Sequence, residues 1–467
     1  MGRAEEALAR IAVSTRHQAW SDEARKLAQV AIADTLATGI AGMLSEQTIS
    51  ARLATSCNTG PGSVPVWEGT ARYAPADAAF ILGVASHSLD WDDYMHPMHG
   101  HCSSVLLPVA WTIAEHTGAS GEELLNGFLA GYQVNYLASL AFGNAHYVRG
   151  WHATSTVGTL GAAAVAARML QLTYEQTQNA LAIASSLASG LRVNFGSPTK
   201  ALHAGSAARH GVEAALLARS GARGSSDWLL GNHGMLATFG GEVDAPAAEQ
   251  LILDAFPGPH GILTAWGLVQ KPYSCCGSCH AAVEGVIALA TAHDLNPSDL
   301  EAFEVHLDPL VPSIMQVGVP TDPYSARYSL SWALAAAMVD RAAGPRQFSA
   351  AALERDDIHS MRRRIAIVAD LQNTDHDRFG ARIVVRYKGI EIVEDVRHST
   401  GHPERPMTST QRESKQREAL SFVTDPGSVV ALMNVTAELD SPIAVSELGD
   451  KIRFALATKA DTLTTAT

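Results

Sequence analysis

The stretch GWHATSTVGTLGAAAVAARM, residues 150–169, points to the fold class most directly, because its second half consists almost entirely of small residues. A helix of such side chains over 158–169 can approach its neighbours closely, so we expect it to be buried against other helices. Thr154, Ser155 or Thr156 could cap this helix, and unpaired N–H groups at a helix start attract anions. The stretch therefore predicts a helical bundle with a polar helix start beside His152.

Helical patterns continue on both sides of this stretch. An early one begins at Asp22, with acidic residues in its first turn, as helix starts favour. The others cover residues 76–89, 105–116, 121–141, 178–190 and 203–220. Glycines and short polar segments separate them, which is typical of connections between packed helices.

The pattern changes after Trp266. Short apolar or alternating runs indicate strands at 303–307, 365–368 and 382–393, the last of them a hairpin with Lys388-Gly389 in its turn. Helical patterns accompany the strands at 281–293, 325–342 and 349–360. A polar linker over 401–408 leads back to a helical pattern that lasts to Leu456.

These patterns predict a mainly α protein with two domains, since 467 residues are long for a single core. We expect residues 1–266 together with 399–467 to form an all-helical domain. Residues 267–398 should form a smaller α+β domain.

Composition narrows the class of protein. The shares of hydrophobic (47%) and charged (17%) residues are those of ordinary globular proteins, and the net charge of −13 argues against nucleic acid as a partner. No run of about 18 uncharged apolar residues is present, so we expect no membrane span. The five cysteines, with no secretory signal ahead of them, predict free thiols in a cytoplasmic protein. An anionic substrate would require this acidic chain to gather its positive groups in one cationic cavity.

The segment SHSLDWDDYMHPMHGH, residues 86–101, is dense in groups that carry chemistry. Three Asp and three His fall between Asp90 and His101, and burying so many polar groups is costly without a purpose. They could bind a metal, since imidazole and carboxylate are good ligands, or a carboxylate could orient an imidazole for acid–base work. A solvated loop with a proline turn is the plain alternative.

A second polar segment, residues 192–205, leads into a helix. Lys200 and His203 are three residues apart and can share one helical face. A lysine that faces a pocket can hold a carboxylate, and it becomes a base at neutral pH when it is desolvated or near other cations. An ordinary surface lysine, and for His152 an ordinary packed histidine, are the alternatives.

The segment KPYSCCGSCH, residues 271–280, contains Cys-x-x-Cys-His. This string resembles haem attachment or half of a zinc site, but haem attachment requires export, and Cys57 and Cys102 are too isolated to complete a zinc site. His280 instead stands at the start of the helix over 281–293, where the helix dipole would tune its charge. No phosphate-loop, dinucleotide or serine-hydrolase motif is present, which argues against those chemistries.

Five segments resemble the MmgE/PrpD family in content and order, over residues 5 to about 450. They are HSLDWDDYMHP (87–97), GWHATSTVGTLGAAA (150–164), SPTKALHAGSAARHGVEAALLA (197–218), KPYSCCGSCHAA (271–282) and TGHPERPMT (400–408). Members of this family include 2-methylcitrate dehydratase, cis-aconitate decarboxylase and iminodisuccinate epimerase. The resemblance implies an all-helical large domain, a smaller α+β lid domain, a homodimer, a small polycarboxylate substrate, and neither a cofactor nor a metal.

The resemblance also implies the catalytic residues. The catalytic set carries over to Asp90, His101, His152, Lys200 and His280. The set expected to contact substrate is Tyr94, His96, His99, Arg192, His203 and Tyr273. Three departures count against a decarboxylase: Tyr94 where relatives often have Thr, an additional residue in the loop at 98–100, and Trp332 where the decarboxylase carries a catalytic Tyr.

The chemistry common to the family is removal of a proton from a carbon beside a carboxylate, which requires positive charge near the developing enolate. We expect Lys200 to act as base on one face, with His101, oriented by Asp90, opposite. Epimerisation of an imino-dicarboxylate such as iminodisuccinate is the reaction favoured here. Dehydration of a 2-methylcitrate-like acid and decarboxylation of cis-aconitate are alternatives. A non-enzymatic metal-binding helical protein is the alternative from another class.

Overall fold

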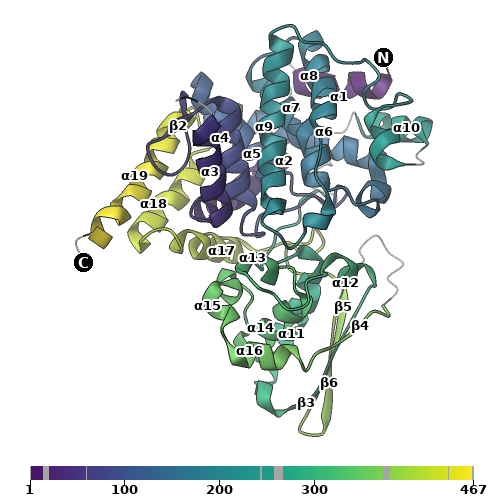
Figure 1. The fold of residues 1–467 in the computed structure, drawn as a ribbon, viewed down its shortest axis with the longest axis vertical. Helices are drawn as coiled ribbons and strands as arrows, with labels where there is room; N and C mark the ends of the chain where they lie inside the picture. The colour runs from purple at the N-terminus through teal and green to yellow at the C-terminus, as the bar shows by residue number, and fades with distance from the viewer. Residues whose placement is uncertain are drawn as a thin grey trace.

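The computed structural model describes residues 2–13, 20–58, 60, 62–241, 244–256, 267–371, 379–439 and 441–464. Figure 1 shows two lobes, a larger helical one and a smaller one that carries a sheet. The larger lobe contains α1 (Arg3–Val13), α2 (Asp22–Gly42), α3 (Glu46–Asn58), α4 (Pro75–His87), α5 (Ser103–Thr117), α6 (Gly121–Val148), α7 (Ala153–Met169), α8 (Tyr174–Leu187), α9 (Thr199–Arg219) and α10 (Ala245–Ala255).

Helix α7 lies at the centre of this lobe, as its small residues predict. Every residue from Ala153 to Ala167 is buried. Its neighbours come so close that a Cβ on Gly161 would lie 2.3 Å from Oδ1 of Asn135 on α6, and a Cβ on Gly211 of α9 would lie 2.2 Å from the Cβ of Ala162. Small side chains therefore let α6, α7 and α9 pack almost backbone to backbone.

The smaller lobe is built on a four-stranded sheet in the order β4-β3-β5-β6. Its strands are β3 (Leu300–Leu307), β4 (Ala366–Val368), β5 (Ala381–Tyr387) and β6 (Ile390–Val396), and only the β3–β4 pair is parallel. Lys388 and Gly389 join β5 to β6 with φ angles of 51° and 76°, the left-handed turn that suits a two-residue hairpin. The predicted hairpin is thus confirmed.

Helices flank this sheet. They are α11 (His280–Ala292), α12 (Leu310–Ile314), α13 (Pro323–Ala326), α14 (Leu330–Asp340), α15 (Ala350–Leu353) and α16 (Asp356–Arg362). The pattern over 325–342 predicted one helix, but the chain breaks it between α13 and α14. Helix α11 packs on the sheet so closely that a Cβ on Gly285 would lie 2.3 Å from Cδ1 of Ile383.

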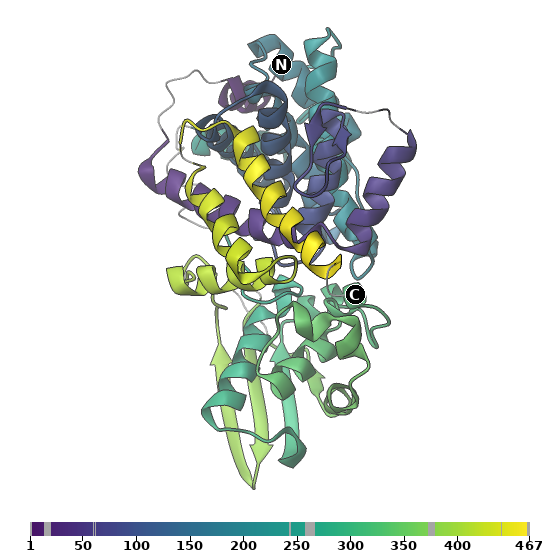
Figure 2. The same ribbon diagram turned by 90° about the vertical axis from the view of Figure 1, so that its left-hand side faces the viewer.

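The chain returns to the larger lobe through α17 (Ser409–Ser421), α18 (Pro426–Ala437) and α19 (Val445–Thr464), which Figure 2 shows in yellow in front of that lobe. A buried lysine joins the two parts: Nζ of Lys415 on α17 lies 2.6 Å from Oδ1 of Asp34 on α2 and donates to the carbonyl of Trp91. The predicted boundary at residue 266 falls outside the described residues.

The prediction of an all-helical domain is wrong in one detail, because the larger lobe also contains two short strands. A short antiparallel pair, β1 (Val64–Pro65) and β2 (Arg72–Tyr73), lies between α3 and α4. Two-residue strands carry too little alternation to register as a pattern in sequence.

Within the described ranges, no single helix is long and apolar enough to cross a membrane; α2 and α3 reach that length and hydropathy only as a pair bent by 77°.

Candidate active site

The polar motifs of both halves of the chain meet at one cavity between the lobes. From the larger lobe it is lined by Asp90, Tyr94, His99, His101, Tyr147, His152, Phe195 and Lys200, and from the smaller lobe by Cys276, Gly277, Ser278, Ile314, Tyr328 and Phe379. Helix α4 ends, and α7 and α9 begin, at this side of the bundle. Segments more than 100 residues apart therefore contribute to one site.

Backbone geometry turns the polar loop inward after α4. Asp90 adopts φ of 46°, a left-handed conformation that is uncommon for residues other than glycine. Tyr94 exchanges two backbone hydrogen bonds with Val269, at 2.9 and 2.8 Å. Because Lys271 lies only two residues beyond Val269, this pairing holds the segment of Lys271 beside the loop that carries Asp90.

Asp90 lies between two buried lysines. Its Oδ1 is 3.0 Å from Nζ of Lys200 and 2.9 Å from Nζ of Lys271, and Lys271 also donates to the Asp90 carbonyl at 2.6 Å. Burial alone would raise the pKa of Asp90, but the two ammonium groups outweigh it and hold that pKa far below its ordinary value. Asp90 is therefore ionised, and the ion cluster satisfies charges that would be costly to bury alone.

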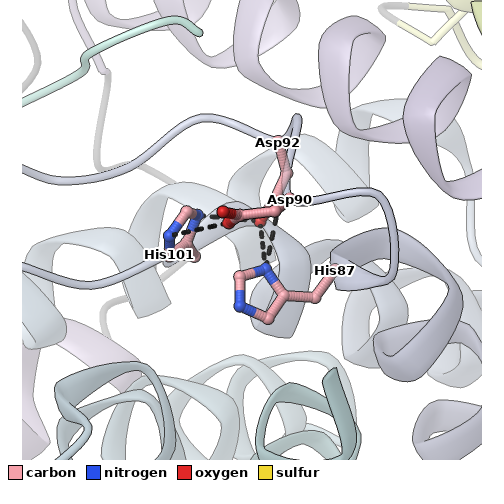
Figure 3. Close-up of side chains that lie close together, drawn as sticks. All are labelled: His87, Asp90, Asp92 and His101. Atoms are coloured by element: carbon pink, nitrogen blue, oxygen red, sulfur yellow. Dashed lines mark hydrogen bonds and ion pairs between the residues drawn. The ribbon is translucent and has the colours of Figure 1, made fainter. Parts of the chain in front are cut away.

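A second carboxylate, Asp92, orients two imidazoles, and Figure 3 shows both rings turned toward the acidic pair. Nδ1 of His87 is 2.9 Å and Nδ1 of His101 is 3.0 Å from Oδ2 of Asp92. The carboxylate accepts from Nδ1–H of each ring, which assigns the tautomers and leaves each Nε2 as an acceptor. Nε2 of His87 is 2.7 Å from Nζ of Lys200, and Nε2 of His101 is 3.8 Å from Asp90.

The imidazoles of the site are neutral at neutral pH. Burial lowers the pKa of His87 to about 4 despite the opposing effect of Asp92, and burial also lowers the pKa of His101. Burial, then the charge of Lys200, lowers the pKa of His152 well below its ordinary value. In the free protein the two buried lysines are therefore balanced by the carboxylates of Asp90 and Asp92, and these imidazoles add no positive charge.

His152 precedes α7 and packs against a second histidine. Its Nδ1 is 3.0 Å from Nδ1 of His203, so one ring donates to the other, and His203 lies behind His152 rather than in the cavity lining. The prediction of a hydroxyl cap on α7 is wrong: His152 is the N-cap and makes no side-chain cap bond, and Thr154 lies within the helix, where its Oγ1 accepts from N–H of His101 at 2.9 Å. Thr154 thus ties α7 to the polar loop.

Four of these residues also form a possible metal-ligand group. One donor atom from each of His87, Asp90, Asp92 and His101 lies within 4.8 Å of the others. However, the Lys200 ammonium contacts both His87 and Asp90, and Lys271 occupies the same Asp90 oxygen. The Asp90 oxygen of this group is therefore already paired with two ammonium groups, and this pairing disfavours the metal-binding alternative.

The other residues expected to contact substrate lie around the cavity in different ways. Tyr94 and His99 line it. Arg192 lies outside the lining; its guanidinium stacks 3.9 Å from the ring centroid of Tyr147 and donates to the Tyr147 carbonyl. His96 lies outside the lining as well, with its ring centroid 5.9 Å from that of His99.

His280 and Tyr273 are also displaced from the cavity. His280 begins α11, as predicted, but its Nε2 lies 3.1 Å from the carbonyl of Cys275 and its ring meets Tyr273 edge-on. Both rings are outside the lining, although Cys276, which lies between them in sequence, is part of it. This placement suits support of the wall more directly than contact with a ligand.

Trp332 lies away from the cavity. It is fully buried in the smaller lobe, and its Nε1–H donates to the carbonyl of Gln347 at 3.0 Å. Tyr328, four residues earlier, is the phenol of this segment that lines the cavity. The Trp332 departure therefore says little about the chemistry of the site.

The predicted site residues left out His87, Asp92 and Lys271 of the ion cluster, and Tyr147, Phe195, Cys276, Gly277, Ser278, Ile314, Tyr328 and Phe379 of the cavity lining. Lys271 could have been inferred from charge balance, because a buried acidic loop needs positively charged side chains from elsewhere in the chain. His87 and Asp92 belong to the dense polar segment 86–101, whereas the position of the remaining residues at the cavity depends on distant neighbours.

Asp93 provides a test of this electrostatic description. Burial, with Asp34 and Asp92 nearby, raises the pKa of Asp93 well above the ordinary value of 3.8. The Asp93 carboxyl group therefore lowers the free energy of unfolding increasingly as the pH rises above that value. Asp93→Asn should therefore unfold about 2 °C or more above the wild type at pH 7, with the gain vanishing near pH 4. Thermal unfolding at both pH values checks this, and a lower midpoint at pH 7 would contradict it.

Comparison with known proteins identifies the family of this chain. The human cis-aconitate decarboxylase is 39% identical to this chain over 204 residues. The matched part spans 42% of this chain and 42% of that enzyme, so it covers less than half of either protein. The cis-aconitate decarboxylases of Mus musculus (27% over 79% of this chain and 76% of that one) and Aspergillus terreus (25% over 83% of each) match along most of their length. The models of the MmgE/PrpD N-terminal and C-terminal domains match residues 6–247 and 273–439. With both of its domains present in order, the chain belongs to the MmgE/PrpD family.

Proposed function

We propose that this protein is a cofactor-independent lyase that decarboxylates a small unsaturated polycarboxylate similar to cis-aconitate. The observation that carries the proposal is the Lys200 ammonium, held by Asp90 within a cavity that also exposes the imidazoles of His101 and His152. The names of the relatives support the substrate class. A cytoplasmic homodimer, with the smaller lobe as lid, remains our expectation from the family resemblance.

The cavity offers acids that can complete a decarboxylation. Among the described lining residues Lys200 is the only ammonium or guanidinium group, and burial, with Lys271 adding to it, lowers its pKa. A substrate carboxylate near His101 or His152 would raise the pKa of these imidazoles and allow them to take up a proton. Substrate binding would thus add positive charge to that of the Lys200 ammonium.

The proposed step balances with one proton. The bond from carbon to the departing carboxylate breaks, CO₂ leaves, and the electron pair is delocalised toward a remaining carboxylate. Lys200, or a protonated imidazole, then gives its proton to carbon, and solvent restores it. Positive charge beside the developing enolate lowers the barrier.

The arrangement of the acid–base groups favours a lyase over an epimerase. Lys200 and His101 both lie within 4 Å of Oδ1 of Asp90, so they share one wall of the cavity. The smaller lobe contributes Ile314 and Phe379, which carry no exchangeable proton, together with Cys276, Ser278 and Tyr328. Burial raises the pKa of the Cys276 thiol and of the Tyr328 phenol, so neither is ionised to act as a base at neutral pH. An epimerase needs a base on each face of carbon. Epimerisation of an iminodisuccinate-like compound gains no support from the relatives, and Trp332 no longer argues against decarboxylation.

Proton NMR in heavy water tests the proposal on three compounds: cis-aconitate, 2-methylcitrate and iminodisuccinate. We expect CO₂ release from cis-aconitate, one deuterium in the product, and the same rate after treatment with a chelator. Exchange within iminodisuccinate without loss of CO₂ would instead establish an epimerase. Alkene formation from 2-methylcitrate alone would establish a dehydratase.

A further inference from the structure

His87 is buried directly behind the lysine of the proposed chemistry. It is the last residue of α4, has no exposed surface, and lies outside the cavity lining. It cannot touch a substrate, yet it contacts both Asp92 and Lys200. Any role in turnover must therefore act through a neighbour that lines the cavity, and Lys200 is the lining residue to which His87 is hydrogen-bonded, whereas His101 only packs against its ring.

The hydrogen bonds around His87 run in one direction. Asp92 holds the ring with its two oxygens 3.0 and 2.9 Å from Nδ1, so Nδ1 carries the hydrogen and Nε2 keeps its lone pair. Nε2 then accepts from Nζ of Lys200 at 2.7 Å. Neutral His87 is required for this bond, and burial favours the neutral ring.

This arrangement uses two of the three donors on Lys200. One N–H points to Oδ1 of Asp90 at 3.0 Å, and a second points to Nε2 of His87. The ammonium can no longer rotate freely about its last bond, and one N–H is left for the cavity that Lys200 lines. The rings of Phe195 and Tyr328, at 5.4 and 5.5 Å from Nζ, also border the group.

We propose that His87, oriented by Asp92, is a positioning residue that fixes the Lys200 ammonium so that its remaining N–H faces the substrate. The proposal rests on the proposed role of Lys200 as proton donor. Misplacing a reacting group by about 1 Å can cost roughly 10²-fold in rate. A residue with a purely structural role would instead affect stability and leave the geometry of Lys200 unchanged.

Two substitutions distinguish the role of Nδ1 of His87, which faces Asp92, from that of Nε2, which faces Lys200. His87→Asn keeps an N–H donor for Asp92 at the place of Nδ1 but removes the acceptor near Lys200, whereas His87→Gln can place an oxygen near the position of Nε2. We expect kcat on cis-aconitate to fall by about 10²-fold in His87→Asn, with KM within about threefold of the wild type. His87→Gln should recover about tenfold or more of that loss. Equal kcat in the two variants would overturn the proposal.

A second measurement does not depend on turnover. The rate at which an acylating reagent labels Lys200, followed by mass spectrometry over a range of pH, reports the state of its ammonium. Loss of the acceptor should shift the midpoint to lower pH in His87→Asn but not in His87→Gln, since the charged form loses a hydrogen bond. If the wild type turns over no polycarboxylate, the proposed function fails while this shift still supports the positioning role. Identical labelling profiles in the wild type and His87→Asn would overturn that role.

Discussion

Replacement of Lys200 by methionine is expected to lower kcat by about 10²- to 10⁴-fold, the range that positioned proton donors contribute. Methionine has a similar length but carries neither a proton nor a charge. The cavity would lose the only ammonium among its described lining residues, and the bound carboxylates would lose their compensating charge. The fold should survive, because Asp90 keeps its pairing with Lys271. Steady-state rates of CO₂ release measure the effect.

A matched control removes a lysine from the surface. Lys451 on α19 has a side chain that is 47% exposed and pairs with Glu438. Lys451→Met should keep turnover within about twofold of the wild type, since exposed ion pairs contribute little. If Lys200→Met retained more than about one tenth of wild-type kcat, Lys200 would be removed from the proton-transfer step.

Asp90→Asn is expected to cause the largest loss of stability, about 3–5 kcal/mol, together with loss of turnover. The amide is nearly the same size as the carboxylate but leaves two buried ammonium groups without the charge that contacts both of them. The depressed pKa of Asp90 in the folded protein contributes stability that is present above about pH 4 and declines in stronger acid. The difference between wild type and variant should therefore be large at pH 7 and shrink as the pH falls. Urea unfolding at several pH values measures it.

A double variant tests the cause of that loss. Adding Lys271→Met to Asp90→Asn removes one of the uncompensated charges, so the double variant should be more stable than the sum of the two single losses implies. An Asp90→Asn variant within about 1 kcal/mol of the wild type would show that the buried cluster is not ionised as described. Strict additivity in the double variant would show that Asp90 and Lys271 do not interact.

The sequence predicted most of the helical lobe because the pattern of a helix depends on residues that are close together in sequence. The small residues of α7 and the Lys388-Gly389 turn each depend on neighbours a few positions away, and both were found where expected. The interruption between α13 and α14 and the strands β1 and β2 were missed, since short elements leave too few residues for a period to show.

Within the site, the sequence singled out the residues whose chemistry is unusual in itself. Asp90, Tyr94, His99, His101, His152 and Lys200 all line the cavity. Family motifs alone did not separate them from His96, Arg192, His203, Tyr273 and His280, which lie behind or beside it. A motif names residues that are near one another in sequence, but it does not say which side chain faces the open space.

By itself, then, the sequence determined the family, the mainly helical fold and the kinds of groups that could move a proton, because periodicity and motif order are local properties. Only the tertiary structure decided that Lys200 and Lys271 share one carboxylate, that His87 lies behind Lys200, and that burial keeps His87 and His101 neutral. The physical reason is that protonation depends on burial and on charges a few ångströms away, and folding brings those charges from segments far apart in the chain.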